Sequence, residues 1–134
     1  MEDYREVNAV FTKKRQYFQN RIGREFDFTS FTGPYEYLLG ALAGCWTYTL
    51  FGALGESTTF TDIKVNVKGR KRDEVPTVLE ETVLTVLVTG CSDEEDFRRA
   101  ASQADSDCSI YNTIGRVSHM STDLVFSDWT GYHQ

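Results

Sequence analysis

The stretch that decides the fold is residues 33–46, with the sequence GPYEYLLGALAGCW. Its large apolar residues are interleaved with glycine and alanine, and a cysteine, Cys45, stands near its end. Proline is favoured in the first turn of a helix, where its missing N–H costs no hydrogen bond, and glycine commonly follows the last turn. The stretch therefore predicts a long helix that runs from Pro34 to about Leu54 and ends at Gly55.

This predicted helix has no charged face. Charged residues are absent from Tyr37 to Gly55, 19 positions in a row, which is about the length that spans a bilayer. Threonines and glycines dilute its hydrophobicity, however, and glutamates flank it in place of the basic anchors of membrane helices. We therefore favour a helix buried on all sides, most simply by a second copy in a dimer. A stripe of small residues could let that second helix cross closely: Ala41, Cys45, Thr49 and Gly52.

Length and composition favour one domain that spans residues 1–134. The net charge of −6 disfavours binding to nucleic acids and to anionic membranes. The first residues lack the apolar segment of a signal peptide. Three cysteines do not suit a secreted disulfide scaffold. We therefore expect a cytoplasmic protein whose thiols stay reduced or cycle between reduced and oxidised forms.

The rest of the chain combines strand patterns with one more amphipathic helix. Strands are predicted at residues 5–12, 16–22, 25–29, 60–68, 77–89 and 116–127. The spacing of four apolar residues predicts a helix: Phe97, Ala100, Ala101 and Ala104. Ser92 is its expected N-cap, in a capping box with Glu95, and a short helix is expected from Cys108 with Asp107 as its cap. This order is typical of an α+β fold with hairpin-linked strands.

Two cysteines, Cys45 and Cys108, could be either reactive or structural. The thiolate is the reactive form of cysteine, and burial in apolar surroundings raises the pKa of a thiol. A buried Cys45 would therefore need a cation nearby, either Arg15 or a lysine of the first hairpin. Cys108 would gain from a helix N-terminus, but the charges of Asp105 and Asp107 oppose that gain. Taken singly, each thiol could also be a small buried hydrophobe.

Both cysteines lie in segments that resemble the motifs of one known family. Residues 34–45, PYEYLLGALAGC, resemble the first cysteine motif of the OsmC/Ohr family of thiol-dependent hydroperoxide reductases. Residues 108–114, CSIYNTI, resemble the second motif of that family, usually written Cys-Pro-Val-Ser-Asn-Thr. The order and lengths of the predicted elements agree with the family as well, so the resemblance covers essentially the whole chain.

The resemblance implies an intertwined homodimer in which antiparallel sheets from both subunits wrap around two long central helices. It also implies that Cys45 is a peroxidatic cysteine, that Cys108 resolves it as a disulfide, and that Arg15 stabilises the thiolate. A dithiol reductant would then reset the site. No cofactor, metal, nucleic acid or membrane is expected, and the two histidines, His119 and His133, lack the spacing of metal ligands.

Two positions depart from the family motifs. The Ohr branch has a glutamate ten residues before its first cysteine, where this chain has Tyr35, and the acid here is Glu36. Nine helical residues span roughly 13.5 Å and leave Glu36 half a turn out of phase with Cys45. Glu36 could act through Arg15, a bent helix start or the partner subunit, or it could stabilise the helix N-terminus. Ser109 stands where the second motif has proline.

The predicted function is a cysteine-based peroxidase that reduces organic hydroperoxides. An apolar wall formed by Tyr37, Trp46 and Phe51 would favour bulky substrates. The alternative is a non-catalytic OsmC-like domain that binds a small apolar or thiol-reactive ligand between its subunits. Cys91 matches no motif position, and we expect it to be incidental.

Overall fold

The computed structural model describes residues 4–128. The chain forms two units, one ending at Leu38 and the other beginning at Leu39, and each is described by itself. His133, one of the two histidines considered above, lies outside the described residues.

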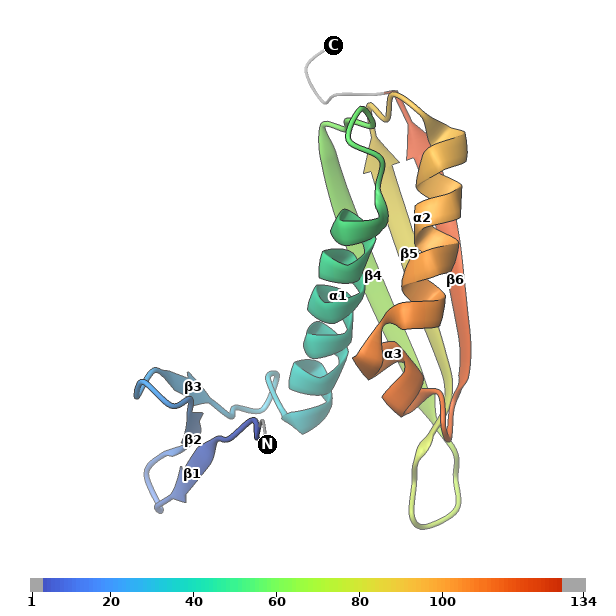
Figure 1. The fold of residues 1–134 in the computed structure, drawn as a ribbon. Helices are drawn as coiled ribbons and strands as arrows, with labels where there is room; N and C mark the ends of the chain where they lie inside the picture. The colour runs from blue at the N-terminus through green and yellow to red at the C-terminus, as the bar shows by residue number, and fades with distance from the viewer. Residues whose placement is uncertain (1–3, 129–134) are drawn as a thin grey trace, which may run out of the picture. The chain divides into compact units, whose positions relative to one another are not determined.

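The first unit is a three-stranded antiparallel sheet. Its strands are β1 (Asn8–Phe11), β2 (Gln16–Gln19) and β3 (Glu25–Asp27), in the order β1-β2-β3 (Figure 1). All three predicted strands are present, each shorter than the pattern indicated. Phe18 lies opposite Phe26 in the register, and their rings stack with centroids 5.1 Å apart. Phe28 and Tyr37 pack against the same ring of Phe18, so an aromatic cluster holds this small sheet together.

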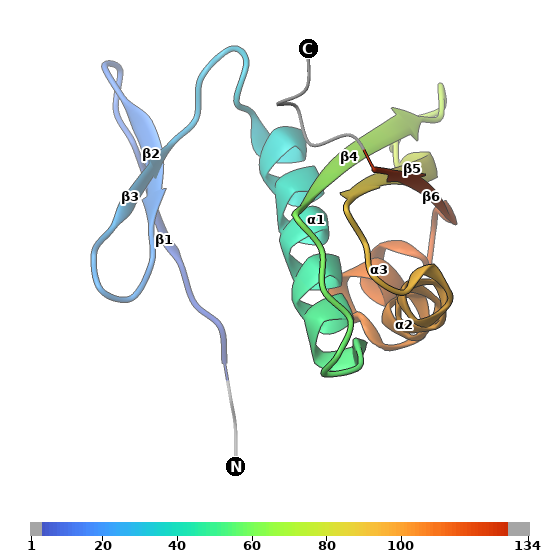
Figure 2. The ribbon, with the colours of Figure 1, turned by 90° about the horizontal axis from the view of Figure 1, so that it is seen from above.

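The second unit carries a sheet with helices on one face. Helix α1 (Pro34–Ala53) leads into it, as the sequence predicted. The remaining elements are β4 (Asp62–Lys71), β5 (Leu79–Thr89), α2 (Glu94–Asp107), α3 (Ser109–Ile114) and β6 (His119–Ser127). The sheet order is β4-β5-β6, with β5 in the centre. Figures 1 and 2 show α1, α2 and α3 on the same face of this sheet.

The pairing of β5 with β6 corrects one expectation. β4 and β5 form the expected antiparallel hairpin, but β6 runs parallel to β5, with Glu81 opposite His119 and Thr89 opposite Ser127. The prediction of purely antiparallel sheets was therefore wrong, and the second sheet is mixed. The cause is the connection: α2 and α3 carry the chain across the sheet, and parallel strands require such a crossover.

The core lies between the sheet and the helices. Alternate residues of β5, namely Leu84, Val86 and Val88, are fully buried. They lie on the covered face together with the buried residues of the helices: Leu42, Trp46, Leu50, Phe97, Ala100, Ala101 and Ala104. The predicted apolar spacing of α2 is thus confirmed. Each large side chain buried in this way contributes about 1.5–3 kcal/mol.

Within the single chain, helix α1 is buried on one side only, and the burial of its other side by a second copy stays a prediction. Leu42, Trp46 and Leu50 form its buried stripe, whereas Tyr48 is 75% exposed and Phe51 is 45% exposed. A uniformly apolar sequence gave no periodicity from which to distinguish the two sides. Among residues 4–128, no helix is long and apolar enough to cross a membrane.

The helix caps differ from the predicted ones by one residue each. The N-cap of α2 is Asp93, whose side chain accepts from the backbone N–H of Asp96. Ser92 does not cap the helix, and its Oγ instead accepts from the N–H of Thr59. The N-cap of α3 is Cys108 and not Asp107.

Asp96 fixes the end of α1 to the start of α2. Its carboxylate accepts from the Thr58 hydroxyl at 2.6 Å, from the Gly55 N–H at 2.8 Å and from Arg99. These hydrogen bonds, that of Thr58 foremost, lower the pKa of Asp96 to about 2. The loop after α1 is therefore held in place at neutral pH, which helps to fix the position of the helix that carries Cys45.

Candidate functional site

The first cysteine of the site lies midway along α1. Cys45 precedes Trp46, which is fully buried and donates from Nε1 to Asp105 Oδ1 at 2.8 Å. The same carboxylate oxygen accepts from the Thr122 hydroxyl at 2.9 Å. Trp46 thereby fixes the rotation of α1 about its axis. The neighbouring Cys45 side chain is placed at the boundary of the core, where it is partly exposed.

The second cysteine lies at the break between α2 and α3. Cys108 has an extended backbone (φ −67°, ψ 121°), and its N–H closes α2 by donating to the Ala104 carbonyl. Its carbonyl accepts from the Asn112 side chain at 2.8 Å, and its Sγ accepts from the Tyr111 N–H at 3.4 Å. The fully buried thiol is thus held in one orientation.

Asn112 is a positioning residue that the sequence analysis did not single out. Its Nδ2 donates to the carbonyls of Asp105 and Ser106 as well as to that of Cys108. One side chain therefore provides hydrogen bonds to the carbonyls at the end of α2 and fixes the turn that carries the Cys108 thiol. The available signal was the asparagine in the CSIYNTI segment, since asparagine readily bonds nearby backbone groups.

The fold brings the two predicted cysteines together. Cys108 Sγ donates to Cys45 Sγ at 3.2 Å, although the residues are 63 positions apart in the chain. Ser109 Oγ lies 3.7 Å from the same Cys45 sulfur. The third thiol, Cys91, is free and lies between β5 and α2.

The surroundings shift the two thiol pKa values in opposite directions. Burial raises the pKa of Cys45, but hydrogen bonds from the Ile110 N–H, the Cys108 thiol and Ser109 outweigh it, so the pKa lies below its usual value. Burial raises the pKa of Cys108, and the adjacent Cys45 raises it further. Cys45 therefore ionises first, and Cys108 stays a thiol that donates to it.

Such a pair can carry out thiol chemistry. The ionised sulfur is the nucleophile, and a second thiol in contact with it can form a disulfide once the first has been oxidised. The hydrogen bonds that stabilise the Cys45 thiolate come from the segment 108–110. Within residues 4–128 of the single chain, these donors lower the pKa of Cys45 without a contribution from a cation.

The other two predicted site residues lie in the unit that ends at Leu38. Arg15 bonds Asp27 at 2.6 Å and Glu25 at 2.7 Å, and its guanidinium lies 4.1 Å from the centroid of the Tyr17 ring. Glu36 Oε1 accepts from the Gly33 N–H at 2.7 Å. This contact matches one predicted alternative, in which Glu36 stabilises the start of its own helix.

The three residues of the predicted apolar wall have different surroundings within the single chain. Trp46 belongs to the buried core, and Tyr37 donates its hydroxyl to the Asp27 carbonyl within the first unit. Phe51 stacks on Phe60 with centroids 5.9 Å apart. The three residues follow one another along α1 at spacings that place them on different sides of the helix.

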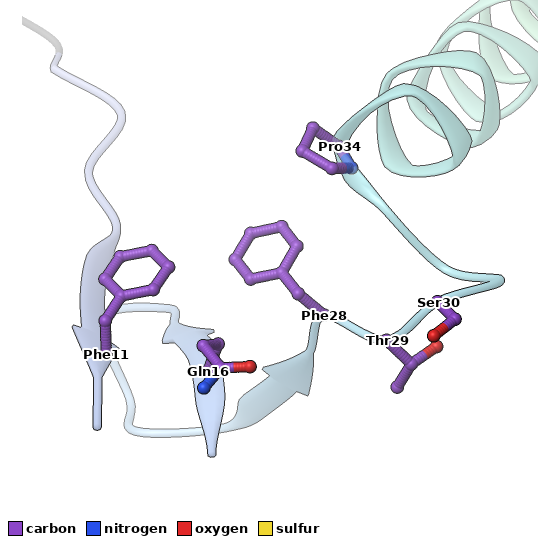
Figure 3. A pocket seen from close by; sticks show the side chains of 6 residues that line it. All are labelled: Phe11, Gln16, Phe28, Thr29, Ser30 and Pro34. Atoms are coloured by element: carbon purple, nitrogen blue, oxygen red, sulfur yellow. The ribbon is translucent and has the colours of Figure 1, made fainter. Parts of the chain in front are cut away.

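An open apolar cleft does occur within the first unit. It has a volume of about 570 Å³, and Figure 3 shows the rings of Phe11 and Phe28 facing into it. Gln16 and Pro34 also line the cleft, together with Thr29 and Ser30. Its size falls within the range of small-molecule pockets.

The family model described as OsmC-like protein matches residues 28–123, which include both cysteines. This chain belongs to the OsmC-like family. The family predicted from the two cysteine motifs is thus confirmed. No curated protein has a sequence that matches the chain.

Several solved structures share the fold of this chain. An OsmC-like protein from Mycoplasma pneumoniae has a TM-score of 0.80 at 17% identity, over 95% of this chain and 99% of that one. A hypothetical protein from Aquifex aeolicus has a TM-score of 0.79 at 20% identity, over 93% and 98%. The organic hydroperoxide resistance protein OhrB of Bacillus subtilis has a TM-score of 0.64 at 16% identity, over 91% and 98%. At these identities the likeness establishes the α+β OsmC-like fold.

Proposed function

We propose that this OsmC-like protein is a thiol peroxidase that reduces organic hydroperoxides, with Cys45 as the peroxidatic and Cys108 as the resolving cysteine. The observation that carries the proposal is the contact of the two sulfur atoms at 3.2 Å. The opposite directions of their pKa shifts support the assignment of the two roles. Membership of a family whose relatives include proteins named for organic hydroperoxide resistance supports the substrate class.

The proposed reaction runs in three steps. The Cys45 thiolate attacks the terminal oxygen of the hydroperoxide, the O–O bond breaks, and the alkoxide leaves as an alcohol after taking a proton. Cys45 is thereby oxidised to a sulfenic acid. Cys108 then attacks the Cys45 sulfur, an S–S bond forms and water leaves. A dithiol reductant supplies two electrons and two protons through thiol–disulfide exchange.

The raised pKa of Cys108 suits the order of these steps. The Cys45 thiolate is one cause of that raised pKa. Once Cys45 has become a neutral sulfenic acid, its negative charge is gone and Cys108 can lose its proton more readily. The resolving thiol is therefore activated by completion of the first step.

Arg15 and Glu36 stay in the proposal as a cation for the Cys45 thiolate and a carboxylate that orients that cation. The Arg15 side chain is 43% exposed and Glu36 is also exposed, so a second copy of the chain can reach both. On this contact, the Cys45 thiolate would replace Asp27 or Glu25 as the partner of Arg15.

We also propose that the chain acts as a homodimer in which residues 1–134 form one OsmC-like domain. The open side of α1 exposes Tyr48 and Phe51, and the first unit exposes Phe11. Tyr48 and Phe51 are in contact with each other, and adjoining exposed aromatic side chains suit a surface that a partner covers. Two such helices packed together would give the intertwined arrangement with two central helices.

Gly44→Leu is expected to weaken this dimer without harming the single chain. A Cβ atom at Gly44 would meet nothing within 4 Å in one chain, but a leucine would separate two closely packed helices. Sedimentation equilibrium should give a dimer for the wild type and a shift towards monomer for the variant. Ser102→Leu, an exposed position on α2, is the matched control, and equal dimerisation of both variants would contradict the proposed interface.

The catalytic proposal is tested by exposing the reduced protein to an alkyl hydroperoxide and mapping its peptides by mass spectrometry. We expect one Cys45–Cys108 disulfide, the loss of two titratable thiols per chain, and recovery of both thiols on treatment with a dithiol. Cys91→Ser should behave in the same way. Thiols that stay unmodified, or a disulfide that involves Cys91, would contradict the proposal.

The second candidate function is a non-catalytic domain that binds a small apolar ligand, and the cleft lined by Phe11 and Phe28 favours it. Unreactive thiols in a folded protein would support this function over the first.

The peroxidase proposal requires a reducing compartment that supplies the dithiol reductant, which supports the cytoplasm as its location.

A further inference from the structure

One polar side chain touches the Cys45 sulfur without belonging to the cysteine pair. Ser109 is the first residue of α3 and follows Cys108 directly. Its Oγ lies 3.7 Å from Cys45 Sγ, within hydrogen-bonding reach for sulfur. Its side chain is on the exposed border of the site, whereas Cys108 approaches the same sulfur from the buried side at 3.2 Å.

We propose that Ser109 stabilises the Cys45 thiolate by donating a hydrogen bond from its hydroxyl. A thiolate can only accept a hydrogen bond, so a hydroxyl in contact with it must be the donor. Hydrogen bonds to a charged partner are stronger than those between neutral groups. Ser109 and the Cys108 thiol therefore share the stabilisation of one negative charge.

Within the single chain, the other polar groups close to Cys45 already donate to its sulfur or are paired elsewhere. The Cys108 thiol is in direct contact with Cys45 and donates to it. The Asp105 carboxylate is bound by Trp46 and Thr122, and the Tyr111 hydroxyl faces Thr122. Hydrogen bonding from Ser109 is also among the causes that offset burial and lower the pKa of Cys45.

The hydroxyl of Ser109 distinguishes this chain from the motif that the segment resembles. Proline, which stands at this position in that motif, has no hydroxyl. This chain thus supplies a side-chain donor at a position where proline would supply none, while the first helical position tolerates either residue.

The test is the pH dependence of Cys45 alkylation by iodoacetamide, resolved by peptide mass spectrometry. In Ser109→Ala we expect the rate at neutral pH to fall about threefold, because the hydroxyl donor is lost. The midpoint of the alkylation profile should move to higher pH in this variant. Ser109→Thr should keep the wild-type profile.

Thr113→Ala provides the matched control. Thr113 lies on α3 and donates to the Ser109 carbonyl, but it has no part in the contacts of the Cys45 sulfur described above. An unchanged profile in Ser109→Ala would overturn the assignment, as would equal slowing in Ser109→Thr or Thr113→Ala. Far-ultraviolet circular dichroism checks that each variant is folded.

This inference deepens the proposed peroxidase function, but its test does not depend on turnover. A shifted profile in a protein that consumes no hydroperoxide would leave the Ser109 assignment standing and contradict the peroxidase. Turnover of hydroperoxide with an unshifted alkylation profile would leave the peroxidase proposal standing and overturn the Ser109 assignment.

Discussion

Cys45→Ser is expected to lose hydroperoxide turnover by about a thousandfold or more while it keeps the wild-type fold. A serine hydroxyl does not ionise near neutral pH and is a weak nucleophile without an adjacent base. The substitution also preserves a small polar group on the partly exposed side of α1, so the core around Trp46 should be undisturbed. The measurement is the initial rate of hydroperoxide consumption with excess dithiol.

Two variants make this result specific. Cys91→Ser should turn over at the wild-type rate, because Cys91 lies outside the thiol pair. In the absence of dithiol, Cys108→Ser should consume one equivalent of hydroperoxide and stop at a sulfenic acid that dimedone traps on Cys45. Substantial turnover by Cys45→Ser would assign the nucleophile elsewhere.

The oxidised protein is expected to resist unfolding better than the reduced protein by about 4 kcal/mol in the free energy of unfolding. A Cys45–Cys108 disulfide would close a loop between residues 63 positions apart, and a crosslink over a long loop restricts the unfolded chain strongly. The two sulfur atoms are already in contact in the reduced state, so the native backbone needs little adjustment to form the bond. Urea denaturation of both forms at equal protein concentration measures the difference.

Cys108→Ser is the control for this comparison, since it cannot form the bridge and should unfold at the same urea concentration before and after peroxide treatment. Equal midpoints for oxidised and reduced wild-type protein, with the disulfide verified by mass spectrometry, would contradict the expectation.

The long apolar helix was the most predictable part of the fold. Proline at its start and glycine just beyond its end placed α1 correctly, and the spacing of Phe97 and Ala104 placed α2. The two sides of α1 could not be told apart, because exposed Tyr48 and buried Leu50 look equally apolar in the sequence. Which side of a helix is buried depends on the elements that pack against it, and the sequence of the helix does not specify them.

The candidate site was predictable in its cysteines and less so in their surroundings. Cys108 as the N-cap of α3 escaped prediction because serine, threonine, asparagine and aspartate are the residues usually found there. The ion pair of Arg15 with Asp27 depends on the register of β2 and β3, which local sequence does not specify. The role proposed for Ser109 became visible only when the fold placed its hydroxyl beside Cys45.

The parallel pairing of β5 with β6 has a consequence for the order in which the molecule folds. β4 and β5 are joined by a hairpin and can pair early, whereas β6 reaches β5 only after α2 and α3 have crossed the sheet, and such non-local contacts form slowly. Cys108 lies inside that crossover. The groups that lower the pKa of Cys45 therefore take their places late, and the lowered pKa of this thiol is a property of the completed sheet.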